Sequence, residues 1–161
     1  MSAKRTPAAQ TFVTPRRQRG ATAVEFAILF PLFFMILYGL VTYGMIFAAQ
    51  QTLTLAATEG ARAALGYQAA STPTAALAAR ADAACTAAKN LTGWLAAKGS
   101  ESACVSMSCA YAPSMDCIQV TVTYPYAANP LLPAIPLFGA ALVPSTLSSQ
   151  ATVQLNPANL L

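Results

Sequence analysis

A single carboxylate precedes the longest apolar run of the chain. Glu25 is followed by residues 26–49, which contain no charged side chain. A carboxylate near the start of a membrane helix is costly unless it finds a partner or stays at the interface. If the chain were cut after Gly20, Ala21 would carry a free ammonium, and Glu25 would lie one helical turn away on the same face. This spacing predicts that Glu25 neutralises that ammonium or the ammonium of a neighbouring subunit.

The thiols form a second group of reactive side chains. All four cysteines follow the apolar run, at Cys85, Cys104, Cys109 and Cys117. An even number of cysteines in a short exported segment is typical of disulfides, so two bridges are expected. A zinc site is the alternative, but no two cysteines form a C-x-x-C pair and the chain has no histidine. We therefore expect no metal.

The positive charge of the chain is concentrated before Gly20. Five of the nine basic residues lie there, whereas four basic and five acidic residues follow. The remainder thus has no basic face for a nucleic acid, and we expect no nucleic-acid partner. Basic residues that flank a membrane helix stay on the cytoplasmic side. Residues 1–20 are therefore predicted to be a disordered cytoplasmic leader, with the C-terminal part outside the inner membrane.

The apolar run is long enough to cross a bilayer, which takes ~20 helical residues. We predict one helix over about residues 21–65 that leaves the membrane near Gln50. A cleaved secretory signal is disfavoured because the run is longer than an ordinary h-region and no clear A-x-A site follows. A plain signal anchor explains everything except Gly20 and Glu25. Gly44 and Ala48 form a small-xxx-small pair, and Gly39 lies near the same stripe, so helix packing there is a further prediction.

Several motifs of this helix together resemble a known family. The sequence Arg19-Gly20, then Glu25-Phe26, then an apolar helix is similar to the processing motif of type IV prepilins. With Pro31 and the tetrad Glu59-Gly60-Ala61-Arg62, residues 16–65 resemble the TadE-like pseudopilins of the tight-adherence (Flp, type IVb) pilus machinery.

The resemblance implies a processing site and a set of partners. Prepilin peptidase would cut between Gly20 and Ala21, and Glu25 would act in subunit assembly. The implied partners are this peptidase, other pilins or pseudopilins, inner-membrane pilus assembly proteins and the membrane itself. The implied location is the bacterial inner membrane, in a single pass with a periplasmic C-terminal domain, or the pilus.

Downstream of the first helix, the pattern changes to that of a small α+β domain. Thr72-Pro73 predicts the start of a second helix that runs to about Lys98, with Gly99 as its stop. Residues 105–111, 117–124 and 146–155 have strand-like alternation. We therefore predict a leader over 1–20, a transmembrane and continuing helix over 21–66, and a periplasmic α+β domain over 67–161. Its sheet is expected to be short and antiparallel.

The apolar, proline-rich segment over residues 129–144 is too short and interrupted to span a membrane. We expect it to pack under the sheet, with contact to the membrane surface or to a partner subunit as alternatives. Trp94, the only tryptophan, is expected in the core.

Four cysteines allow three pairings. We favour Cys85–Cys104, which would tie the second helix to the sheet, and Cys109–Cys117, which would close a hairpin. In direct register, the apolar faces of the two hairpin strands would point to opposite sides, and a bulge near residues 112–116 would remove this conflict. Without such a bulge, Cys104 becomes the better partner for Cys117.

The sequence offers no enzyme chemistry. There is no histidine, P-loop, G-x-G-x-x-G motif or nucleophile elbow. We predict a non-enzyme without a cofactor, namely a pseudopilin-like minor subunit or assembly component of the pilus or a related secretion system. The alternative is a single-pass, signal-anchored envelope protein with an extracytoplasmic binding domain.

Overall fold

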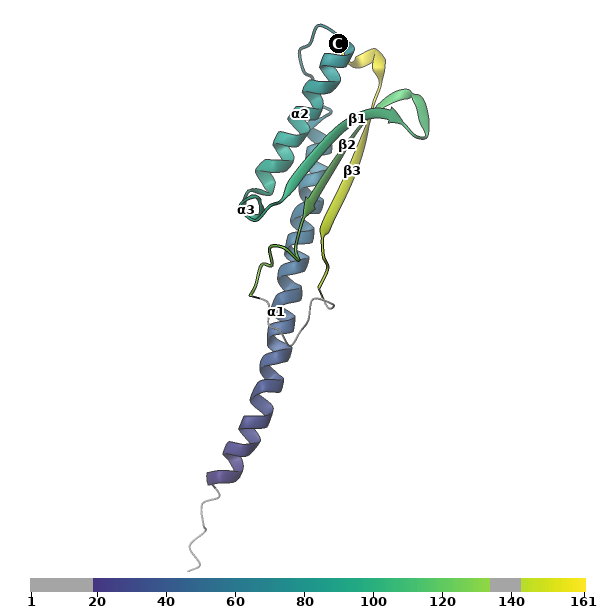
Figure 1. Ribbon diagram of the computed structural model, residues 1–161. Coiled ribbons are helices and arrows are strands. Elements are labelled where there is room, and N and C mark those ends of the chain that lie inside the picture. Colours follow the sequence, from purple (N-terminus) through teal and green to yellow (C-terminus); the bar gives the residue numbers. More distant parts are fainter. Residues whose placement is uncertain (1–18, 134–142) are drawn as a thin grey trace, which may run out of the picture. The chain divides into compact units, whose positions relative to one another are not determined.

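The computed structural model describes residues 19–133 and 143–161 (Figure 1). It has the predicted α+β architecture: a long N-terminal helix, a second helix and a three-stranded antiparallel sheet. The elements in order are α1 (Arg19–Ala63), α2 (Pro73–Leu91), α3 (Gly93–Ala96), β1 (Glu101–Cys109), β2 (Ala112–Tyr124), β3 (Leu147–Leu155) and a 3-10 turn (Pro157–Asn159).

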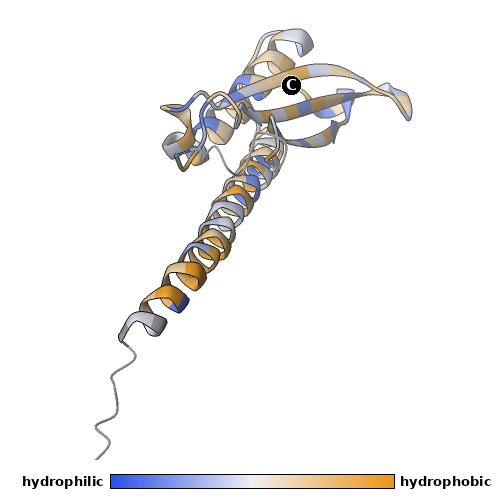
Figure 2. Ribbon diagram, turned by 60° about the horizontal axis from the view of Figure 1, so that its bottom comes forward, coloured by the Kyte–Doolittle hydropathy of each residue, from blue (hydrophilic) through white to orange (hydrophobic). Residues whose placement is uncertain are grey.

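Contacts divide the chain into two units, residues 1–39 and 40–161, and α1 contributes to both. In the first unit, the structure describes only helix, and nearly all its described side chains are exposed. Its apolar character is visible in Figure 2 as the orange first part of α1. The second unit combines the rest of α1 with α2, α3 and the sheet. The core of this domain therefore begins well before residue 67.

Helix α1 is continuous through Pro31 and is 45 residues long. It ends in a tightened last turn, where the amide of Gly66 donates to the carbonyl of Ala63 at 3.1 Å. Gly66 does not adopt the left-handed conformation common at helix ends, and this 3-10-type bond satisfies the last turn instead. Among the described residues, only Gly99 has a positive φ, at 89°. It lies where the end of the second helical region was predicted.

The sheet has the order β1-β2-β3, and each neighbouring pair is antiparallel. Along β2, alternate side chains from Ile118 to Tyr124 are buried, as their spacing predicted. They contact a core to which α1 and α2 also contribute, so both helices pack on this face of the sheet. The residues between them, such as Thr121, lie on the other face and are only half-buried.

The buried face of α1 in the domain consists mostly of small residues. They recur every three or four positions: Ile46, Ala49, Leu53, Ala56, Ala57, Ala61 and Ala64. Helix α2 contributes a matching row of alanines, at Ala76, Ala81, Ala84 and Ala88. Because alanine side chains are short, the two helices must lie close together to exclude water from this core.

The second helical region is shorter than predicted. Helix α2 ends at Leu91, and α3 is a separate single turn. Between them, the buried hydroxyl of Thr92 donates back to the carbonyl of Ala88 at 3.2 Å. Leu95 fills the core position after this break, whereas the side chain of Trp94 is 47% exposed. The prediction that Trp94 packs in the core is therefore wrong.

The proline-rich segment over residues 129–144 lies largely outside the described residues, which exclude 134–142. Of its two ends, Leu131 and Val143 are partly buried and pack against the core of the domain.

Candidate processing and assembly site

The predicted cleavage point lies in the first turn of α1. Gly20 is helical and exposed, and a Cβ atom added there would meet nothing within 4 Å. The first four amides of an α-helix have no helical acceptor, so this turn opens at little cost. Ala21 is helical, but its side chain is outside the described residues. Nothing among the residues that the structure describes thus requires glycine at position 20.

Glu25 follows in the second turn of α1, and its side chain is exposed. The helix rises ~1.5 Å per residue, so Glu25 stands ~6 Å along the axis from Ala21 and on the same face. In the part of the chain that the structure describes, the only ion pair joins Glu59 and Arg62. The carboxylate is therefore available for a partner outside its own chain, and its pairing with an ammonium remains a prediction.

An aromatic row continues along α1 from Glu25. Phe26, Phe30, Phe34 and Tyr38 stack in sequence, with ring centroids 5.3, 6.3 and 6.5 Å apart. Residues four apart lie on one helical face, which is why the rings meet. Sequence analysis missed this row, although the spacing of four was readable. The row is the most regular feature of the membrane-length part of the helix.

The apolar part of α1 is suited to a membrane by length and composition. A candidate span covers residues 22–63; its most apolar window has a mean hydropathy of 2.3, and none of that window is buried. A core helix of this hydropathy would be covered by the rest of the protein, whereas the most apolar window of this helix is not covered. The single N-terminal apolar helix is consistent with a single-pass membrane anchor.

The small residues predicted to pack helices are open to an approaching helix in the part of the chain that the structure describes. A Cβ atom added to Gly39 or Gly44 would meet nothing within 4 Å. Ala48 is exposed. A second helix could therefore approach this stripe, and its role in helix packing remains a prediction.

The tetrad at residues 59–62 lies at the other end of α1 and does have a role inside the domain. A Cβ atom added to Gly60 would lie 2.9 Å from the carbonyl oxygen of Ala84, 3.1 Å from Cγ1 of Val120 and 3.3 Å from Cβ of Ala88. Only glycine lets α1 approach α2 and β2 this closely. The ends of the tetrad, Glu59 and Arg62, form an exposed ion pair at 3.2 Å. Such a surface pair adds little stability.

These features of α1 coincide with a family match. Residues 20–62 match the family model of TadE-like proteins. The resemblance seen in the sequence is therefore confirmed over the helix that carries Gly20, Glu25 and Gly60. The match supports a protein associated with the Tad pilus and with a membrane. It does not extend to α2 or the sheet, and neither a curated protein nor a solved structure matches the chain.

Outside the matched residues, two disulfides link elements of the domain to one another. Cys85 of α2 is bonded to Cys104 of β1, with 5.7 Å between their Cα atoms. This α2–β1 disulfide holds the second helix on the sheet. Cys109 and Cys117 form a hairpin disulfide with 5.1 Å between Cα atoms. Both pairings are those favoured from the sequence.

The hairpin disulfide depends on an irregularity in β2. Ser108 is paired with Asp116, but the next residue, Cys109, is paired with Ala112. Three residues of β2, 113–115, are thus left without a partner in β1, which is the predicted bulge. Both cysteines of this bridge are buried, at 2% exposure each.

Proposed function

We propose that this chain is a pseudopilin-like minor subunit or assembly component of a tight-adherence (Flp, type IVb) pilus or a related secretion system. One observation carries the proposal. Gly20 and Glu25 stand five residues apart at the head of an exposed apolar helix, inside the region that matches the TadE-like family. Neither residue has a structural role among the described residues, whereas both have one in a processed subunit.

Maturation by prepilin peptidase would begin at the first turn of α1. The bond after Gly20 lies at the basic, cytoplasmic end of the anchor. Unwinding this turn breaks few hydrogen bonds, and a glycine leaves the backbone accessible to the peptidase. Cleavage removes the basic leader and creates an ammonium on Ala21. Glu25 then lies one turn away from it and can hold it, or can hold the ammonium of the adjacent subunit.

Assembly would use the same end of the helix. A carboxylate and an ammonium that pair between helices in a membrane contribute little net stability, because both must be desolvated, but the pair can set the register of two subunits. The exposed stripe of Gly39, Gly44 and Ala48 would let the backbones approach. The proposed partners are other pilins or pseudopilins and the inner-membrane assembly proteins.

The part of the chain that follows the membrane span, from about Gln50 onward, would face the periplasm. Basic residues before the anchor keep the N-terminus in the cytoplasm, so the rest of the chain is exported. Both disulfides fit this location, since disulfides form and persist in the oxidising periplasm. We propose a non-catalytic role without a cofactor.

The N-terminus of the mature protein tests the proposal. The full chain is expressed in a host with prepilin peptidase, and its mass and N-terminal peptide are measured by mass spectrometry. The expected mature chain begins at Ala21. Gly20→Leu should remain uncut in the membrane, because leucine does not fit a peptidase site built for glycine.

Gly39→Leu is the matched control, because this glycine also lies in the exposed part of α1 and a Cβ atom there meets nothing within 4 Å. It should mature like the parent. A parent chain that keeps residues 1–20 would contradict the proposal and would favour the alternative, a signal-anchored envelope protein.

A further inference from the structure

The second helix buries a positive charge without an acidic partner. The side chain of Arg80 is only 5% exposed. Among residues 19–133 and 143–161, no carboxylate lies within 4 Å of its guanidinium, since the one ion pair there uses Arg62. A buried charge is costly unless it is paired and hydrogen-bonded. None of the described carboxylates therefore neutralises the buried guanidinium of Arg80 by a direct ion pair.

The hydrogen bonds of Arg80 use only one of its three nitrogens. Nη2 donates to the backbone carbonyls of Asn159 and Leu160, at 3.2 and 3.3 Å. Nε is buried without a hydrogen-bond partner in the structure. Nη1 makes no hydrogen bond within the described residues. The two carbonyls thus attach Arg80 to the C-terminal turn, but they carry no net charge, and three N–H groups remain unused.

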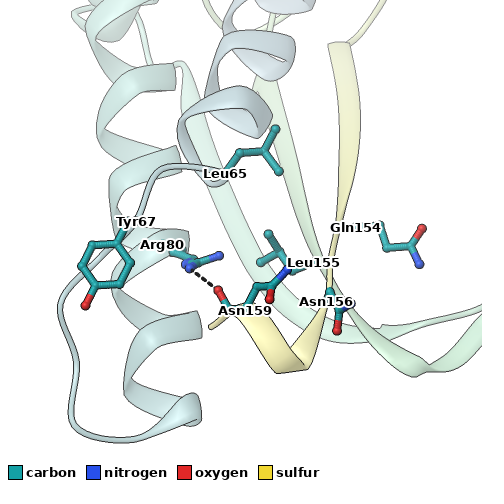
Figure 3. A pocket seen from close by; sticks show the side chains of 7 residues that line it. All are labelled: Leu65, Tyr67, Arg80, Gln154, Leu155, Asn156 and Asn159. Atoms are coloured by element: carbon teal, nitrogen blue, oxygen red, sulfur yellow. Dashed lines mark hydrogen bonds between the residues drawn. The ribbon is translucent and has the colours of Figure 1, made fainter. Parts of the chain in front are cut away.

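A pocket of about 310 Å³ adjoins this guanidinium. Figure 3 shows Arg80 pointing from α2 toward the side chains at the end of β3 and the following turn. The lining combines apolar side chains with three side-chain amides: Leu65, Tyr67, Gln154, Leu155, Asn156 and Asn159. None of these residues is acidic. The pocket therefore joins a cation, apolar contacts and amide groups that can both donate and accept hydrogen bonds.

We propose that this pocket binds a carboxylate, carried by the C-terminal end of a peptide. The carboxylate would accept from the N–H groups of Nη1, because Nη2 is already bonded and Nε is closed off from the pocket, and it would supply the missing negative charge in a charge-assisted interaction. The last side chain of the peptide would contact Leu65 and Leu155. The amide oxygens of Gln154 and Asn156 already accept from Tyr111 and from the backbone of Ala158, so their NH2 groups are the parts that can donate to a peptide carbonyl. A volume of about 310 Å³ is at the small end of ligand pockets and suits one or two residues.

A purely structural role for Arg80 explains less. As a brace between α2 and the C-terminal turn, it would need only Nη2, and an uncharged donor would do the same at a lower desolvation cost. The brace also leaves Nη1 unused beside a pocket whose lining residues include no acid. The carboxylate site is independent of the proposed pilus role, since it uses no residue of the processing site.

The test observes the guanidinium directly in the full-length protein in detergent micelles. Arginine is labelled with ¹⁵N, and the Nε–H signals are followed by NMR during titration with N-acetyl-alanyl-leucine. The same dipeptide as its C-terminal amide lacks the charge, and sodium acetate supplies the carboxylate without the peptide. The signal of Arg62, which is exposed and already paired with Glu59, is an internal control.

The free acid should shift the Arg80 signal saturably, with the Arg62 signal unchanged. The amide should bind about tenfold or more weakly, because it lacks the charge-assisted bond. Acetate that binds as well as the dipeptide would assign the carboxylate to a small free anion, whereas weaker acetate binding would assign it to a peptide terminus.

Three results would overturn the proposal: an Arg80 signal that does not move, equal shifts with the acid and the amide, or acetate that binds as tightly as the dipeptide. Arg80→Lys keeps the charge but loses the fork of donors, and should weaken binding of the acid. The titration of the parent protein decides between these outcomes, so the test stands even if Arg80→Lys fails to fold.

Discussion

Gly60→Ala is the most direct test of the close approach between α1 and the rest of its domain. The added methyl group would lie 2.9 Å from the carbonyl oxygen of Ala84, and this oxygen belongs to the backbone of α2. It cannot rotate away, so the helices must separate by some tenths of an ångström. The methyl would also meet Val120, at 3.1 Å, from the side of the sheet.

The expected loss of stability follows from two opposing effects. Overpacking of a well-packed core costs ~1–3 kcal/mol, and contact with a backbone atom favours the upper half of this range. Replacing glycine by alanine inside a helix returns ~1 kcal/mol. The net free energy of unfolding should therefore fall by about 1–2 kcal/mol. For a domain of this size, that lowers Tm by roughly 4–8 °C.

The assay is thermal unfolding of the full chain in detergent, with both disulfides intact, followed by the fluorescence of Trp94 and by near-UV circular dichroism. Gly44→Ala, in the same helix but with nothing within 4 Å of the added methyl, is the matched control. It should leave the Tm unchanged or raise it. If Gly60→Ala is as stable as Gly44→Ala, the contact of Gly60 with α2 and β2 is not as close as described.

Two further sites give predictions of their own. Glu25→Gln should leave membrane insertion intact but weaken association with other pilus-system subunits, whereas Glu59→Gln should leave this association unchanged. Co-purification after cross-linking measures the association of each variant. Equal recovery of the subunits with the two variants would contradict an assembly role for Glu25. Loss of the α2–β1 disulfide, in the double variant Cys85→Ser and Cys104→Ser, should lower the free energy of unfolding by about 3 kcal/mol. Loss of the hairpin disulfide, which closes a shorter loop, should lower it by about 2.5 kcal/mol; chemical unfolding measures both values. Stepwise reduction followed by peptide mapping should open the half-buried α2–β1 disulfide before the buried hairpin disulfide, and the reverse order would refute this ranking.

The sequence was sufficient to predict the elements whose signals are local. The long apolar run predicted α1, and alternation predicted β2, with alternate side chains from Ile118 to Tyr124 on one face, and the presence of β3. Thr72-Pro73 marked the start of α2, and the hydroxyl of Thr72 does accept from the amide of Ala75. These features depend on neighbouring residues alone, so one chain suffices to read them.

The orientation of β1 shows where local reading fails. Its apolar side chains Val105 and Met107 are 52% and 39% exposed, and they lie on the outer face of the sheet. Met107 is paired with Cys117 and therefore points to the same side of the sheet. Ile118, which follows Cys117, points inward to the core, so Cys117 and Met107 point outward. The bulge brings the cysteines together but does not turn β1 over. The face of an edge strand is set by register with its partner, which a single strand does not encode.

The burial of Arg80 was unreadable for a related reason. An arginine on an alanine-rich helix reads as a solvated residue, since arginine is rarely buried. Its burial arises because the C-terminal turn, far along the sequence, covers it and supplies the carbonyls of Asn159 and Leu160. Contacts between residues so distant in the chain leave no periodic signal in either segment.

The residues that carry the family resemblance divide into two groups when their surroundings are compared. Gly60 is explained inside the chain, because any larger residue would meet α2 and β2. Gly20 and Glu25 are exposed, and the described residues give them no contact that requires glycine or a carboxylate. Glycine in a helix costs ~1 kcal/mol, and a carboxylate at the start of a membrane helix is costly unless it is paired or stays at the interface. Residues that destabilise the isolated chain must be accounted for by something outside it, which is what a peptidase at Gly20 and a neighbouring subunit at Glu25 would supply.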